Sequence, residues 1–131
     1  MKPLAFVALH VSRRHRLVVY IWPTLKAMRI KIRKLSGRSE KGVNGYFYAP
    51  RTEIKANGVV KNKVVGEIHL TQKRFGAGVF AHELQHFISW WCNVKDLDPM
   101  EEHWEVVPKL AGDLTNEFWI WFYDNFKPES T

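Results

Sequence analysis

Residues 64 to 91 of the chain read VVGEIHLTQKRFGAGVFAHELQHFISWW. The first part, Val64 to Leu70, is rich in residues that favour strands, and a loop with Gly76-Ala77-Gly78 follows it. The remainder, Val79 to Trp91, is apolar and long enough to form one helix. This stretch therefore predicts a strand, a glycine loop and a helix, on which the rest of the fold is expected to build.

Within the predicted helix, two sets of side chains face in different directions. An apolar stripe at helical spacing is formed by Phe80, Leu84, Phe87 and Trp91. His82 and His86 are four residues apart, so their imidazoles share one face, roughly 140° from the centre of the stripe. We expect the stripe to face the core and the two histidines to face elsewhere.

The pentapeptide His82-Glu83-Leu84-Gln85-His86 has the pattern H-E-x-x-H, which is typical of zinc hydrolases. Both imidazoles can bind one Zn²⁺ ion, because one helical turn brings them to a common point. Glu83 lies about 100° around the helix, where its carboxylate can reach an attacking water molecule without binding the metal. We therefore expect His82 and His86 to be metal ligands and Glu83 to be the general base. The alternative is a pair of helix histidines that form only hydrogen bonds.

A catalytic zinc site usually has a third protein ligand and an open position for water. The longer pattern H-E-x-x-H-x-x-G-x-x-H is absent, because Ser89 and Cys92 stand at its glycine and third-histidine positions. Further along, Asp98 and Pro99 predict the start of a new helix, which Pro108 is expected to kink or restart near its middle. The candidate ligands on this helix are Glu101, Glu102, His103 and Glu105.

The pentapeptide together with residues 105–115, EVVPKLAGDLT, resembles the small gluzincin-type zinc metallopeptidases of the minimal, phage-type kind. The resemblance covers roughly residues 64 to 122 and implies a zincin-like fold. In that group the ligand glutamate lies on the following helix, and Glu105, seven residues before Gly112, matches it best. The larger gluzincins have an Asp where this chain has Lys109. The resemblance thus implies a metal site of His82, His86 and Glu105.

Other assignments of the third ligand stay open. Glu101 and Glu102 fit the simpler description of first-turn acids, which the helix dipole favours. His103 is a rival ligand that would give a three-histidine site.

The 131 residues, 46% of them hydrophobic, fit one α+β domain with a single core, which we take as a zincin-like metallopeptidase domain of residues 1–131. The aromatic-rich segment around Phe118 is expected to be a C-terminal helix that closes this core. Asn57-Gly58 is the best turn signal. The other expected elements are a hairpin of 4–11 and 17–22, a helix around 25–35 that Gly37 ends, and strands at 46–48 and 59–70. Alternation at Met28, Ile30 and Ile32 leaves a strand as the alternative to that helix.

Charge divides the chain into two opposite parts. Residues 1–74 hold 17 Lys and Arg against 3 acidic residues, a net charge of +14, whereas residues 75–131 hold 3 against 10, a net charge of −7. The densest basic stretch runs from Lys26 to Lys41. Its simplest role is a solvated face, and contact with a nucleic acid is the alternative function that the basic half suggests.

Neither an export signal nor a membrane-spanning segment is evident. The apolar run Leu4 to Leu9 is short and is followed by arginines, and no run reaches the roughly 20 apolar residues that a membrane helix needs. Cys92 is the single cysteine, which agrees with a reducing compartment. These features predict a cytoplasmic protein.

The favoured function is a zinc metallopeptidase that cleaves a protein or peptide substrate, in which Glu83 takes a proton from water and passes it to the leaving amine. The strand from Glu67 to Leu70 is a candidate edge for an extended substrate. Candidates for stabilising the oxyanion are Tyr46, Tyr48, His69 and His103. The alternatives are a DNA-associated protease of SprT-like character and a non-catalytic, zinc-stabilised interaction or regulatory module.

Overall fold

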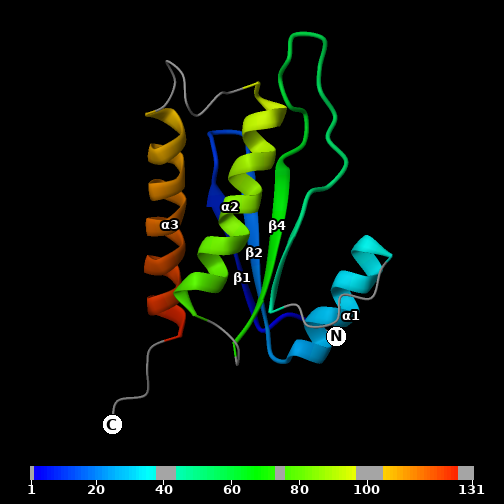
Figure 1. The fold of residues 1–131 in the computed structure, drawn as a ribbon, viewed down its shortest axis with the longest axis vertical. Coiled ribbons are helices and arrows are strands. Elements are labelled where there is room, and N and C mark those ends of the chain that lie inside the picture. Colours follow the sequence, from blue (N-terminus) through cyan, green and yellow to red (C-terminus); the bar gives the residue numbers. More distant parts are fainter. Residues whose placement is uncertain (1, 38–43, 73–75, 97–104, 127–131) are drawn as a thin grey trace.

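The computed structural model describes residues 2–37, 44–72, 76–96 and 105–126. This part of the chain forms four strands and three helices, which confirms the expected α+β class (Figure 1). The strands are β1 (Ala5–His10), β2 (Arg16–Trp22), β3 (Gly45–Tyr48) and β4 (Val64–Thr71). The helices are α1 (Leu25–Ser36), α2 (Ala77–Val94) and α3 (Val106–Asn125).

The strands form one mixed sheet in the order β1-β2-β4-β3. β1 pairs antiparallel with β2, as the hairpin prediction requires, β2 pairs parallel with β4, and β3 pairs antiparallel with β4. The prediction that the strand from Glu67 to Leu70 is an edge is therefore wrong. Most of β4 is buried, since it has a strand on each side and helices over both faces. Among the described residues, β3 is the edge on this side of the sheet.

The helices cover both faces of the sheet (Figure 1). α2 and α3 pack on one face, where their apolar side chains join those of alternate β2 residues such as Val19 and Ile21. α1 packs on the other face, where Met28 and Ile32 contact Trp22 at the end of β2. The candidate metal helix therefore lies between the sheet and solvent, with α3 beside it.

α1 forms where helix-start and helix-stop signals bracket its sequence. The Thr24 hydroxyl accepts a hydrogen bond from the Ala27 N–H at 3.1 Å, and Gly37 ends the helix with a left-handed φ of 73°. Met28 and Ile32 are fully buried, whereas Ile30 is exposed, as helical but not strand geometry requires. The helix prediction for this segment is confirmed.

α2 and α3 complete the core. The predicted apolar stripe of α2 is buried, from Phe80 to Trp91, and Phe80 stacks on Phe118 of α3 with ring centroids 4.0 Å apart. The sequence predicts that Pro108 kinks or restarts a helix that begins at Asp98; the described helix begins at Val106, close to this proline, and continues to Asn125. Pro108 therefore falls in the first turn of α3, where its missing N–H removes no intrahelical hydrogen bond. The predicted start at Asp98 and Pro99 lies outside the described residues.

None of the described helices has the length and apolar character that crossing a membrane requires.

Candidate metal centre

His82, Glu83 and His86 come together on one side of α2, as the H-E-x-x-H spacing predicts. The Nε2 atoms of His82 and His86 are 3.2 Å apart. One possible ligand atom from each of the three residues lies within 4.8 Å of the other two. Both histidines are exposed, whereas Glu83 is only 5% exposed. Two exposed imidazoles therefore lie beside one buried carboxylate.

The separation of the imidazoles fits a zinc ion. Two nitrogens bound tetrahedrally to zinc at about 2.0 to 2.1 Å are about 3.3 Å from each other, close to the observed 3.2 Å. A hydrogen bond between two imidazoles, one donating N–H and one accepting, spans a similar distance. The distance therefore agrees both with two histidines that bind one metal ion and with two histidines joined by a hydrogen bond. A measurement of bound metal distinguishes these two alternatives.

Close contact between α2 and β3 buries the Glu83 side chain. A Cβ atom added to Gly45 in β3 would lie 3.2 Å from Cγ of Glu83 and 2.9 Å from Cγ1 of Val79. Because Gly45 has no side chain, the helix approaches the backbone of the edge strand directly. This packing turns the carboxylate-bearing side of α2 toward β3.

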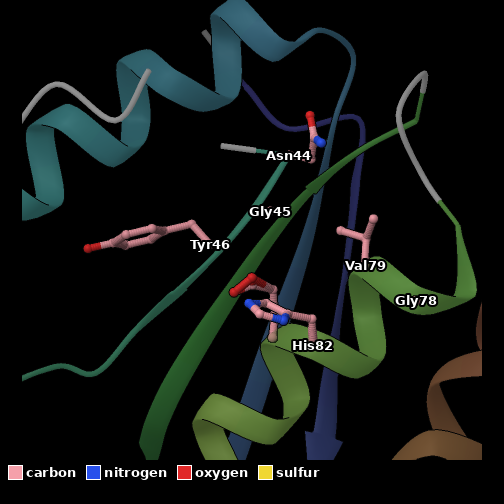
Figure 2. A pocket seen from close by; sticks show the side chains of 7 residues that line it. Asn44, Gly45, Tyr46, Gly78, Val79 and His82 are labelled. Carbon is pink, nitrogen blue, oxygen red and sulfur yellow. The ribbon is translucent and has the colours of Figure 1, made fainter. Parts of the chain in front are cut away.

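A cavity of about 490 Å³ opens where α2 meets β3. The described residues that line it are Asn44, Gly45, Tyr46, Gly78, Val79, His82 and Glu83. Figure 2 shows His82 on the helix, with Asn44 and Gly45 on the strand opposite. The cavity thus joins the candidate metal ligand His82 and the candidate base Glu83 to the edge strand.

Burial raises the pKa of the Glu83 carboxyl above its ordinary value, because removal from water disfavours the charged form, and the nearby His82 and His86 partly oppose this effect. A carboxylate with a raised pKa accepts a proton more readily than an ordinary one.

Glu105 is not brought to the histidines. It is exposed and stands at the start of α3, and its neighbour Val106 shares a cavity with Cys92 and Lys95. Cys92 is ten residues after His82 on α2, which corresponds to about 15 Å along the helix axis. Figure 1 shows α3 beginning beside the end of α2, far from where α2 begins. The structure gives no support to Glu105 as a ligand. α3 runs antiparallel to α2, so Glu105 lies beside the C-terminal end of α2, whereas His82 lies near its N-terminal end.

The other candidates fall into two groups. Glu101, Glu102 and His103 lie outside the described residues. His69 faces α1, on the side of the sheet away from Glu83. Tyr46 lines the cavity, but its side chain packs against the cluster on the α1 side, and Figure 2 shows its ring directed away from His82. Tyr48 lies on the same face as Tyr46, because strand residues two apart share a face. Among the described oxyanion candidates, none points at the site.

Sequence reasoning missed Gly45 and its neighbour Asn44. An Asn-Gly pair is a turn signal, and nothing in the local pattern shows that a helix more than 30 residues later packs against it. The signal that was available is the strand that follows directly, Tyr46-Phe47-Tyr48, which makes Gly45 the first residue of a strand rather than part of a free loop.

Comparisons of the chain with protein-family models, with curated proteins and with solved structures found no match. Support for a function therefore comes from the geometry of His82, Glu83 and His86.

Proposed function

We propose that the protein is a zinc-dependent peptidase of zincin-like fold, with His82 and His86 as metal ligands and Glu83 as general base. The observation that carries this proposal is the pair of Nε2 atoms 3.2 Å apart beside a buried carboxylate in the wall of a cavity. Zn²⁺, when bound, supplies a Lewis acid that polarises a scissile carbonyl and makes water more acidic.

In this proposal, Glu83 moves the proton. Its carboxylate accepts a proton from the attacking water and returns it to the nitrogen of the leaving amine, so that one residue serves both halves of the hydrolysis. Packing against β3 keeps the Glu83 side chain buried beside the two histidines rather than free in solvent. His82 and His86 contribute by binding the metal beside it.

The edge strand β3 supplies the substrate position. Among the described residues no other strand pairs with its outer side, so its free N–H and C=O groups can bind an extended peptide as an added strand. The cavity beside Gly45 leads from this edge to Glu83 and His82. A peptide bound along β3 would therefore pass the candidate base. This assignment replaces β4, which is internal.

The third protein ligand has no assignment among the described residues, since Glu105 lies apart from His82 and His86. Glu101, Glu102 and His103 stay candidates. Any one of these three side chains could supply the third protein ligand of the metal.

Zinc content and hydrolysis test the proposal together. Protein purified without chelator is analysed for metal, and cleavage of an unfolded casein substrate is followed for parent, His82→Ala, Glu83→Gln and Gln85→Ala. We expect near-stoichiometric zinc in the parent and its loss in His82→Ala. Glu83→Gln should keep the zinc and lose activity by about 10²- to 10⁴-fold, the typical contribution of a general base. Gln85→Ala is the matched control, because Gln85 is exposed on the same helix.

Each other outcome has a definite meaning. Zinc that is present with equal cleavage by parent and Glu83→Gln excludes Glu83 as the base. Stoichiometric zinc without any cleavage favours a zinc-stabilised interaction module. Metal content that His82→Ala leaves unchanged favours a histidine pair that is joined by a hydrogen bond.

A further inference from the structure

Another cavity, of about 380 Å³, lies at the opposite end of the sheet from the candidate metal centre. Its walls come from two segments far apart in the sequence, residues 13–16 at the turn that leads from β1 into β2 and residues 55–63 before β4. Figure 1 shows both segments at the end of the sheet where β2 and β4 begin. Six of the ten described lining residues are basic: Arg13, Arg14, Arg16, Lys55, Lys61 and Lys63. We name these six residues the basic cleft.

The two walls are held together by a buried histidine. His15 is 6% exposed, its Nε2–H donates to the Val60 carbonyl at 2.9 Å, and its Nδ1 accepts from the Ser12 hydroxyl at 2.7 Å. Arg16 adds a hydrogen bond from Nη1 to the Ser12 carbonyl at 2.8 Å, and its backbone N–H donates to the Lys63 carbonyl at 2.7 Å. The basic cleft is therefore a fixed feature of the fold.

Few acidic groups neutralise this charge. Glu53 lies 3.9 Å from Lys61, and within the described part of the chain no other carboxylate forms an ion pair with the cleft. Arg13, Arg14 and Lys55 are exposed, so their charges face solvent. Like charges on one concave surface repel each other, and a bound polyanion relieves that repulsion.

We propose that the basic cleft binds the phosphodiester backbone of a nucleic acid. A backbone with regularly spaced phosphates matches several cations on a concave surface, and it gains affinity from each counterion that these cations release. A concave site accepts a chain-like polyanion better than a flat bilayer. The cleft offers charges rather than an element shaped to enter a groove, so the binding is independent of base sequence.

The basic cleft is separate from the candidate metal centre. β4 begins at the cleft with Val64, and Leu70, the partner of Gly45, is six residues further along, a distance of about 20 Å. A nucleic acid in the cleft therefore leaves the cavity beside Gly45 open. Binding of a nucleic acid at the basic cleft requires neither zinc nor peptide hydrolysis.

Fluorescence anisotropy with labelled single and double strands of about 20 nucleotides tests it. The cleft variant carries Arg14→Gln, Lys55→Gln and Lys63→Gln, and Arg16 is left intact because it holds the turn. The matched control carries Lys26→Gln, Arg33→Gln and Lys34→Gln on α1, which removes the same charge from another exposed surface. Thermal unfolding by circular dichroism checks that both variants fold.

We expect the cleft variant to bind about tenfold or more weakly, with a log-log salt slope that is less steep by about 2 to 3 units, since each lost phosphate contact removes close to one unit. The control should stay within about twofold of the parent. Equal losses in both variants would overturn the proposal, because net charge alone would then explain the binding. Absence of binding by the parent would overturn it as well. So would binding to phosphatidylserine vesicles without binding to nucleic acid, which would assign the cleft to lipid headgroups.

Discussion

Gly45 in β3 and Glu83 in α2 are in such close contact that a single added carbon at Gly45 would stand 3.2 Å from the Glu83 side chain. The same carbon would be 2.9 Å from Val79, one turn earlier on the helix. The absence of a side chain at position 45 therefore sets the distance between the candidate base and the edge strand.

Gly45→Ala is expected to destabilise the fold by about 1 to 3 kcal/mol, because overpacking forces the strand or helix to shift. Val79→Ala in the same chain should recover part of this loss, since it removes the nearer clash. Urea unfolding of the two single variants and the double variant gives the coupling between the sites, expected at about 0.5 to 3 kcal/mol.

Gly112→Ala is the matched control for that series. A Cβ atom at this helical position meets nothing within 4 Å, so alanine should stabilise α3 by up to about 1 kcal/mol. Additive effects of Gly45→Ala and Val79→Ala would contradict the direct contact between strand and helix.

Trp22→Phe should cost about 1 to 3 kcal/mol in the free energy of unfolding. The indole N–H of Trp22 donates to Nδ1 of His69 at 2.9 Å, and His69 is fully buried, so the variant leaves a buried acceptor without a partner. Because an indole can only donate, His69 must carry its proton on Nε2, which faces Glu67 at 3.2 Å.

Nitrogen chemical shifts of the His69 ring test this arrangement, and they should show a single tautomer with hydrogen on Nε2. Trp90→Phe removes the same ring atoms from a partly exposed position and serves as the control. A stability loss no greater than that of Trp90→Phe would rule out an energetic role for the hydrogen bond.

Glu105→Ala should leave zinc affinity within about twofold of the parent, because this carboxylate stands at the far end of α2 from His82. His86→Ala should weaken binding severely, since a direct ligand bond is lost. Competition with a chromophoric chelator measures both. Severe loss in Glu105→Ala would support Glu105 as a ligand, the role that the resemblance to gluzincins implies, and would require the start of α3 to move toward the histidines when zinc binds.

Cys92 should react slowly with iodoacetamide at pH 8. Burial raises the pKa of its thiol, so less of the reactive thiolate is present at a given pH, and only 7% of the residue is exposed. We expect folded protein to react slower than protein in urea by about an order of magnitude or more, because access is restricted as well. The rate of the folded protein should rise at higher pH than that of the unfolded chain. Equal rates in the two states would contradict the burial of Cys92.

Features with a local signal were predicted correctly from the sequence. Thr24 and Gly37 bracket α1, and four-residue spacing places His82 and His86 on one face of α2. In each case the structure depends on contacts between residues one or a few helical turns apart, so the local sequence is enough to predict it.

Features that depend on distant parts of the chain were missed. Whether Glu67 to Leu70 forms an edge depends on which strands join it from elsewhere, and β2 and β3 enclose it on both sides. The distance from Glu105 to His82 depends on the path between α2 and α3, which no local spacing determines. Gly45 acquires its role only when α2 packs against it.

The parallel pairing of β2 with β4 imposes an order on folding during synthesis. Their partners, such as Val19 and Ile68, are about 50 residues apart in sequence, which a ribosome working at about 5 to 20 residues per second takes roughly 2 to 10 s to span. Through this interval the β1-β2 hairpin can form, but the inner edge of β2 has no partner, and an open edge pairs readily with other chains. Between the emergence of Trp22 and that of Thr71, this edge of the nascent β2 is therefore open to pairing with other chains.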